Sequence, residues 1–295
     1  MFTRTRPVTK ASSVVLVGLL SGSLLSAQYS RPAPAKGAGK NPLTGHLIKT
    51  GLYMFSGASN TLLRLSSNGL IVVDGQARDH YDALTEQIDR ISDQAIRLLI
   101  TTDHHRVHTA NNTQFAADGT QILAHANVAR HLGAANATGA ATALPTRTYD
   151  DHFSLTLGGI GVQLLHFGKA HTDADSVVYF TNLNVVAVGD LYAATPDPDF
   201  AAGGSLVGWG PVLDDVLKLD FDVAVPGTGP PVTRADVVAF KGKIDTLVSR
   251  ATRLVKQGVP KAQLMTRLQT DDLGWHFAFT GAALDAFYAE LSGRP

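Results

Sequence analysis

The alternation of apolar and polar residues predicts that strands and helices follow one another from residue 51 onward. Residues 61–65 and 70–75 are strand-like runs joined at Asn68-Gly69, a dipeptide that favours a tight hairpin turn. The apolar spacing then predicts a helix over 80–91, a buried strand over 97–101, a helix over 111–117, a strand over 121–124 and a helix over 127–132.

A second series of elements begins near His152. We expect strands at 153–157, 162–166, 176–180 and 184–188, then a helix over 212–217 and a short strand at 223–225. The remainder, residues 234–292, has a mainly helical pattern. Because strands alternate with helices in two successive halves, the sequence predicts an α/β fold with two sheets and helices outside them.

Composition limits the possible chemistry of the protein more than it limits the possible folds. The 295 residues are 44% apolar and 17% charged, which is ordinary for a globular protein with a sizeable core. The chain has no cysteine. Disulfides, thiolate metal sites and a cysteine nucleophile are therefore excluded, and any metal must be held by His, Asp or Glu.

The N-terminus predicts a secretory signal peptide over residues 1–27. Arg4, Arg6 and Lys10 form a basic region, residues 13–25 are mostly apolar, and Ala27 is a suitable last residue before cleavage. An apolar run of this length is shorter than the roughly 20 residues of a membrane-spanning helix, although an uncleaved anchor remains an alternative. We expect a periplasmic or extracellular protein that is not inserted in the membrane after cleavage.

The segment 28–50, with its Pro, Gly, Ala and Lys residues, is expected to be a linker, and 51–295 a domain with a helical C-terminal extension. Cleavage after residue 27 removes three basic residues and no acidic one, which leaves 22 against 25 and a net charge of about −3. This balance, without a basic cluster, argues against nucleic acid and anionic membranes as partners. The oligomeric state stays open.

Four segments that follow predicted strands carry the candidate chemistry. The stretch 102–112 places His104, His105 and His108 after the strand at 97–101, where imidazoles can converge on an ion. The other segments are 169–176 with His171, 188–192 with Asp190, and 225–232 with Thr228.

The stretch 102–112 resembles the T-H-x-H-x-D-H-x-G-G-N signature of the metallo-β-lactamase-fold hydrolases. The order of the other segments agrees with this family from about residue 51 to residue 231, including the Asp-Gly that ends 70–75, the strand-to-helix segment 122–128 and the pair Gly189-Asp190. The resemblance implies a metallo-β-lactamase-type αβ/βα sandwich, in which two mixed β-sheets are flanked by helices.

The family holds two metal ions. Carried onto this chain, the first-ion positions are Asp103, His105 and His171, the bridging position is Asp190, and the second-ion positions are Val107, His108 and Thr228. Valine cannot ligate and threonine ligates poorly, so we expect the second ion's site to be empty. The first set offers two imidazoles and two carboxylates, which suits one zinc ion or alternatively iron.

Several of these residues have a simpler structural interpretation. Asp103 can pair with Arg106 or cap the following turn, and the remaining candidates can be hydrogen-bonded loop residues. His108 is at a second-ion position, and the other two ligands of that ion are absent. His104, His125 and His131 are expected to be structural. Asp173 and Asp175 are possible replacement bases, but their spacing does not fix where they point.

Two hypotheses follow. The first is an exported hydrolase with a mononuclear site, in which metal-bound hydroxide attacks an ester, thioester or lactam of a small-molecule substrate. Its metal ligands are drawn from Asp103, His105, His108, His171 and Asp190, and Asp103 and Asp190 are also its catalytic residues. The second is a catalytically inactive family member that serves as a binding or scaffold module.

Overall fold

The structure, a computed structural model, describes residues 43–276 and 278–293. All of these residues belong to one compact unit. The expected signal peptide at 1–27 and the first part of the expected linker lie outside the described residues.

The first sheet has seven strands, in spatial order from β1 to β7. The strands are β1 (Thr44–Lys49), β2 (Leu52–Ser56), β3 (Asn60–Ser66), β4 (Gly69–Val73), β5 (Ile96–Ile100), β6 (Gln121–His125) and β7 (Arg147–Tyr149). Strands β1 to β4 pair antiparallel, and β4 to β7 pair parallel. The predicted hairpin is confirmed, because β3 and β4 are joined at Asn68-Gly69 with Ser66 opposite Gly69.

The second sheet has six strands in the order β13-β12-β11-β10-β9-β8. These are β8 (His152–Leu157), β9 (Ile160–Leu165), β10 (Val177–Phe180), β11 (Val185–Gly189), β12 (Val223–Pro226) and β13 (Val232–Thr233). Strands β11 and β12 pair parallel, and the other pairs are antiparallel. Both sheets are therefore mixed, as expected.

The helices lie between and after these strands. In chain order they are the 3₁₀ turn η1 (Arg78–His80), α1 (Tyr81–Asp89), α2 (Arg106–Thr109), α3 (Asn112–Ala117), α4 (Ala126–Ala137), η2 (Phe200–Ala202), α5 (Leu206–Val216), α6 (Arg234–Lys256), α7 (Lys261–Arg267), η3 (Asp271–Leu273) and α8 (Gly281–Leu291). Within the described ranges, no helix combines the length and the apolar character needed to cross a bilayer.

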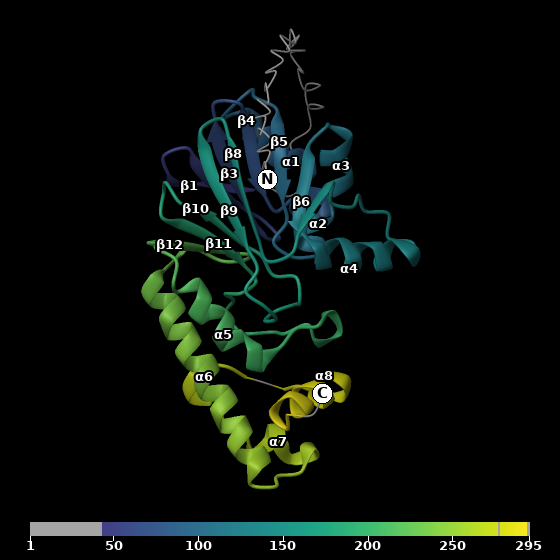
Figure 1. Ribbon diagram of the computed structural model, residues 1–295, viewed down its shortest axis with the longest axis vertical. Helices are drawn as coiled ribbons and strands as arrows, with labels where there is room; N and C mark the ends of the chain where they lie inside the picture. Colours follow the sequence, from purple (N-terminus) through teal and green to yellow (C-terminus); the bar gives the residue numbers. More distant parts are fainter. Residues whose placement is uncertain (1–42, 277, 294–295) are drawn as a thin grey trace, which may run out of the picture. The chain divides into compact units, whose positions relative to one another are not determined.

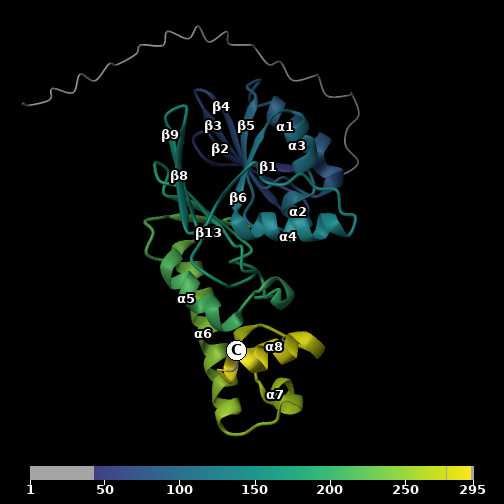
Figure 2. The ribbon, with the colours of Figure 1, turned by 45° about the vertical axis from the view of Figure 1, so that its right-hand side comes forward.

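Strands β4, β10 and β11 are buried on both faces, because helices cover the outer face of each sheet and the two sheets pack on each other, which gives the domain four layers. On β11, Val185 and Ala187 pack into the core between the sheets, while Val186 and Val188 pack against α5, α6 and the later helices. On the first sheet, Leu70 and Val72 pack outward with apolar residues of α1 and α3. Figures 1 and 2 show α1 and α3 beside the first sheet and α5 and α6 beside the second. The predicted αβ/βα sandwich is confirmed.

Two expected boundaries are wrong. Strand β1 lies inside the segment 28–50 that we expected to be linker, so the folded part begins before residue 51. Its first four residues are exposed and therefore lack the apolar alternation that marks a buried strand. Helix α5 begins at Leu206 rather than 212, because Ser205 caps it through the N–H of Gly208 and Pro211 lies within it.

Candidate metal centre

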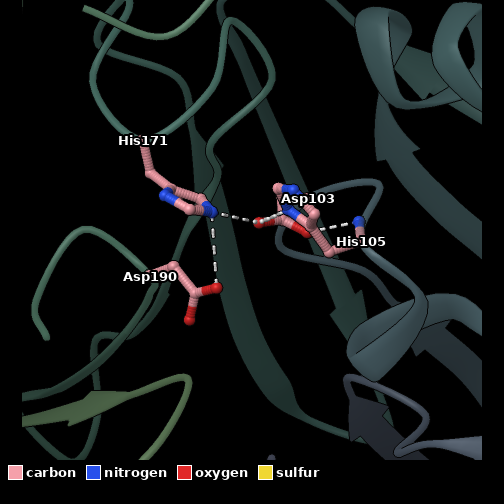
Figure 3. Close-up of side chains that lie close together, drawn as sticks. All are labelled: Asp103, His105, His171 and Asp190. Atoms are coloured by element: carbon pink, nitrogen blue, oxygen red, sulfur yellow. Dashed lines mark hydrogen bonds and ion pairs between the residues drawn. The ribbon is translucent and has the colours of Figure 1, made fainter. Parts of the chain in front are cut away.

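The predicted site residues meet where strands of both sheets end. Asp103 and His105 follow β5, Asp190 directly follows β11, and His171 lies in the loop between β9 and β10. Because β5 runs parallel to β4 and β6, its end reaches the same sheet edge as theirs. Figure 3 shows the four side chains pointing toward one another from three separate loops.

Asp103 points into this cluster and is only 1% exposed. Its Oδ1 accepts the backbone N–H of His105 at 2.7 Å, so one oxygen stabilises the turn, as the simpler interpretation expected. Its Oδ2 lies 3.0 Å from Nδ1 of His105 and 3.7 Å from Nε2 of His171. Burial would raise the pKa of Asp103, but the neighbouring histidines outweigh it and hold the pKa well below its usual range.

His171 is fixed by the backbone of the segment before η2. Its Nδ1 lies 2.6 Å from the carbonyl oxygen of Asp197, and a carbonyl can only accept, so Nδ1 carries the proton. Its Nε2 is then unprotonated in the neutral ring and lies 3.5 Å from Oδ2 of Asp190. The inner nitrogen of His171 is thus oriented as a ligand atom.

His105 is held between two carboxylates. Its Nδ1 faces Asp103, and its Nε2 lies 3.3 Å from Oδ2 of Asp199. Burial lowers the pKa of His105, but the hydrogen bond to Asp103 and the nearby negative charges raise the pKa to about 9. A metal ion at Nδ1 would therefore replace a proton there.

His108 is fully buried and also points into the cluster. Its Nε2 lies 3.2 Å from Oδ2 of Asp190, and its Nδ1 lies 3.1 Å from Oδ2 of Asp74. Asp74 is itself fixed by the backbone N–H and the hydroxyl of Thr102, both at 2.8 Å. Burial lowers the pKa of His108, but Asp74, Asp103 and Asp190 raise it well above its usual value.

These three imidazoles follow one rule. Each has an outer nitrogen near an oxygen of Asp74, Asp197 or Asp199, through a hydrogen bond of 2.6 Å in His171 and ion-pair contacts of 3.3 Å in His105 and 3.1 Å in His108. The inner nitrogens are directed at Asp103 or Asp190. This is the usual arrangement around metal-ligating histidines, in which a second acceptor fixes the ring. One donor atom each from Asp103, His105, His171 and Asp190 lies within 4.8 Å of the others, so the set fits one divalent ion. Ligation by these residues and by His108 remains a prediction.

The second-ion positions are not equipped for a metal. Val107 is half-buried, and its carbonyl accepts the hydroxyl of Ser59 at 2.7 Å. Thr228 is exposed. The neighbouring Gly227 packs so closely on Asp190 that an added Cβ would lie 2.0 Å from its Oδ1. Of the three second-ion positions, only His108 offers a ligating side chain.

The two carboxylates considered as replacement bases belong to structural networks. Asp173 pairs with Arg130 and His131 of α4, at 2.5 Å and 2.7 Å. Asp175 accepts the backbone N–H and the hydroxyl of Thr172, at 2.9 Å and 2.8 Å, and so closes the turn after His171. Neither belongs to the four-residue donor set.

Four other histidines form two stacked pairs. His104 lies on His131 with ring centroids 4.3 Å apart, and burial together with His105 lowers the pKa of His104 to about 4. His125 stacks on His166 at 4.0 Å, and its Nδ1 accepts the N–H of Asn127. His104 also belongs to a second group of possible metal ligands, with His105 and Asp199, whose donor atoms lie within 4.8 Å of one another. The structural roles expected for His104, His125 and His131 stay predictions.

Two residues of the site were missed from the sequence. Asp199 lies beside His105 and also caps η2 through the N–H groups of Ala201 and Ala202. Asp74 lies beside His108 with a positive φ of 61°, a conformation that a non-glycine residue adopts only where its surroundings hold it. The Asp-Gly that ends β4 and the acidic run Asp197-Pro198-Asp199 were the available signals.

A cavity of about 510 Å³ opens over His105 and His171. Residues 197–201 and the Ala282, Ala283 and Ala286 positions of α8 form the rest of its lining. Ligand cavities are commonly about 300–1,000 Å³, so this one can admit a small molecule next to the donor cluster.

We predict that Asp175→Ala lowers the free energy of unfolding by about 2–3 kcal/mol, because it leaves two buried donors of Thr172 without a partner. Burial also raises the pKa of Asp175 to about 7 in the folded metal-free protein. An unfolded aspartate ionises near ~3.9, so between about pH 4 and pH 7 the folded state holds a proton that the unfolded state has lost. Stability from this group therefore falls as pH rises.

Urea unfolding of metal-free protein at pH 5 and pH 8 measures this effect. The difference between the native protein and Asp175→Ala should be larger at pH 5. A larger difference at pH 8 would mean that ionised Asp175 is the form that stabilises the loop.

No family model matches the chain. A curated protein, the 2,4-dinitroanisole O-demethylase subunit alpha of Nocardioides sp. (strain JS1661), is 28% identical over 209 residues, which cover 69% of this chain and 62% of that protein. This chain thus matches less than two thirds of that relative's length.

Solved structures are similar at lower identity. The metallo-β-lactamase from Pontibacter korlensis superposes with a TM-score of 0.62 at 16% identity, covering 69% of this chain and 99% of that one. The DIM-1 metallo-β-lactamase gives 0.61 at 15% identity, covering 70% and 98%. These likenesses concern the fold.

Proposed function

Because the chain has the metallo-β-lactamase fold, we propose that it is a metal-dependent hydrolase with one divalent ion at Asp103, His105, His171 and Asp190. The observation that carries the proposal is the orientation of the imidazoles. Each has its outer nitrogen within 3.3 Å of a carboxylate or carbonyl oxygen and its inner nitrogen facing a carboxylate. A purely structural cluster of hydrogen-bonded loop residues has no need of this common orientation.

The donor set suits zinc and iron, which both take imidazole nitrogen and carboxylate oxygen. We propose zinc as the first choice and iron as the alternative. His108, with Nε2 at 3.2 Å from Asp190 and 4.0 Å from Oδ1 of Asp103, is available as a further donor or as a partner that holds Asp190 in place.

A bound divalent ion supplies Lewis acidity, which polarises the scissile carbonyl and makes a nearby water more acidic. In ester hydrolysis the water oxygen bonds to the carbonyl carbon, the bond to the leaving oxygen breaks, and a proton passes from water to that oxygen. Asp190, whose side chain is 20% exposed, is the carboxylate that water can reach, and its Oδ2 can hold this proton. Asp103 is buried and instead positions His105 and His171.

The second candidate is a catalytically inactive binding module, and Val107 and Thr228 favour it. In the metallo-β-lactamase-fold family that the sequence resembles, these positions hold a carboxylate and an imidazole that bind the second ion. Their loss leaves this chain without the carboxylate that would orient the attacking water. The absence of this carboxylate predicts slower hydrolysis than in family members that bind two metal ions.

Hydrolysis assays with metal removal and return test the proposal. The substrates are simple esters, thioesters and lactams, together with 2,4-dinitroanisole, since the relative's name describes that ether as a substrate. We expect turnover that chelation abolishes and added zinc or iron restores. His171→Ala should be inactive, and His152→Ala, at an exposed position on β8, should match the native protein. Metal-loaded protein without turnover on any of these substrates would instead support the binding module.

We also propose that residues 1–27 are removed during export. The intact mass of protein recovered from the periplasm or the medium measures this directly. A mass that corresponds to residues 28–295 supports the proposal, and the full-length mass contradicts it.

A further inference from the structure

We infer that the cavity over the metal centre takes uncharged substrates with a flat apolar body, such as aryl esters, and discriminates against substrates that carry a carboxylate or a phosphate. The inference rests on the proposed function, since it concerns the substrate of that same site. The observations that carry it are the charges around the cavity and the side chains of its wall.

No lysine or arginine lines the cavity in the described part of the chain. The charged residues of its lining, apart from the histidines, are Asp197 and Asp199. Asp197 is exposed, and the side chain of Asp199 is 31% exposed. An anionic group that enters this cavity therefore meets two carboxylates without a lysine or arginine to pair with.

The metal does not reverse this balance. Asp103 and Asp190 contribute two negative charges, which match the two positive charges of a divalent ion. Asp197 and Asp199 remain as further acidic side chains of the lining, so a bound ion leaves these two negative charges in the cavity wall.

Most of the remaining wall is apolar. Pro198, Phe200 and Ala201 come from the segment before and within η2, and three alanines come from α8. Alanine side chains leave a helix face nearly flat, and Phe200 is fixed edge-on by Phe279 with ring centroids 5.3 Å apart. Such a wall favours the face of an aromatic ring over a branched or strongly hydrated group.

Binding of two matched probes to the metal-loaded protein tests the inference. The probes are 4-nitroanisole, which is neutral, and 4-methoxybenzoate, which has the same ring and carries one negative charge. We expect calorimetric titration to show about tenfold or greater preference for the neutral probe, the order expected for like charges separated by about 8 Å. Equal affinity, or tighter binding of the benzoate, would overturn the inference.

Two variants locate the effect. Ala283→Trp fills the wall on α8 and should weaken binding of 4-nitroanisole at least about tenfold, whereas Ala134→Trp, at an exposed position of α4, should not change it. Asp197→Lys should reduce the discrimination against 4-methoxybenzoate about tenfold. If neither Ala283→Trp nor Asp197→Lys changes the affinity for the probes, the probes bind outside this cavity and the inference is contradicted.

The same titrations, repeated without added metal and set beside the hydrolysis assays, separate this inference from the proposed function. Neutral-probe preference in a protein that binds no metal or has no hydrolytic activity would support the cavity inference and overturn the hydrolase. Hydrolysis of esters without that preference would support the hydrolase and overturn the cavity inference.

Discussion

Asp103→Asn is expected to lower the affinity for zinc at least about 100-fold. Loss of a residue that only holds a metal ligand in place costs about 10- to 100-fold, and Asp103 is proposed as a ligand itself. The change removes the negative charge of a side chain that is 1% exposed and faces His105 and His171. An amide is a poor metal ligand, and its NH₂ group points a donor at the ion. The affinity is measured by competition with a chromophoric chelator.

The asparagine variant is chosen because it keeps the local turn. Its carbonyl oxygen can still accept the backbone N–H of His105, which now binds Oδ1 at 2.7 Å. Circular dichroism and the urea midpoint verify that the variant is folded. Asp93→Asn, at an exposed position in the loop between α1 and β5, is the matched control and should bind metal like the native protein. Unchanged affinity in Asp103→Asn would mean that Asp103 serves the turn alone.

Gly227→Ala is the second large expected effect. A Cβ at this position would lie 2.0 Å from Oδ1 of Asp190 and 3.1 Å from Cε1 of His108, so the Asp190 carboxylate must move. Overpacking of this kind costs about 1–3 kcal/mol of stability. We expect zinc affinity to fall about 10- to 100-fold, the range seen when ligands lose their orientation.

Gly242→Ala is the control for this variant, because its Cβ would meet nothing within 4 Å in the middle of α6. Alanine is the better helix former, so the control should be at least as stable as the native protein. If Gly227→Ala binds zinc normally, Asp190 has room to shift without losing its function, and it is not the fixed ligand that the account requires.

The fold was predictable where burial is regular. Strands β4, β10 and β11 are short apolar runs buried on both faces, β5 is buried except at Arg97, and β3 and β4 are joined by a clear hairpin turn. Strand β1 was missed because four of its six residues are exposed, so its sequence does not differ from that of a linker. Its pairing with β2 is what makes it a strand.

The site was predictable only as far as residue identity goes. His105, His171 and Asp190 follow strands whose ends meet at one edge, and the family resemblance assigned them together. The partners of their outer nitrogens were not predictable, because Asp199 and the carbonyl of Asp197 lie far away in sequence from His105 and His171. Asp175 shows a different limit. Its partners are the N–H and hydroxyl of Thr172, three residues earlier, but the spacing alone did not show that the carboxylate binds them and is not one of the four donors.

The number of metal ions per chain is the measurement that bears most directly on the account. Purified protein is loaded with zinc or iron, dialysed and analysed for metal content against protein concentration. The account predicts one ion per chain, lost in the double variant His105→Ala, His171→Ala. Two ions per chain would show that Val107 and Thr228 have not disabled the second site, and no bound ion would leave the oriented imidazoles without the metal that explains them.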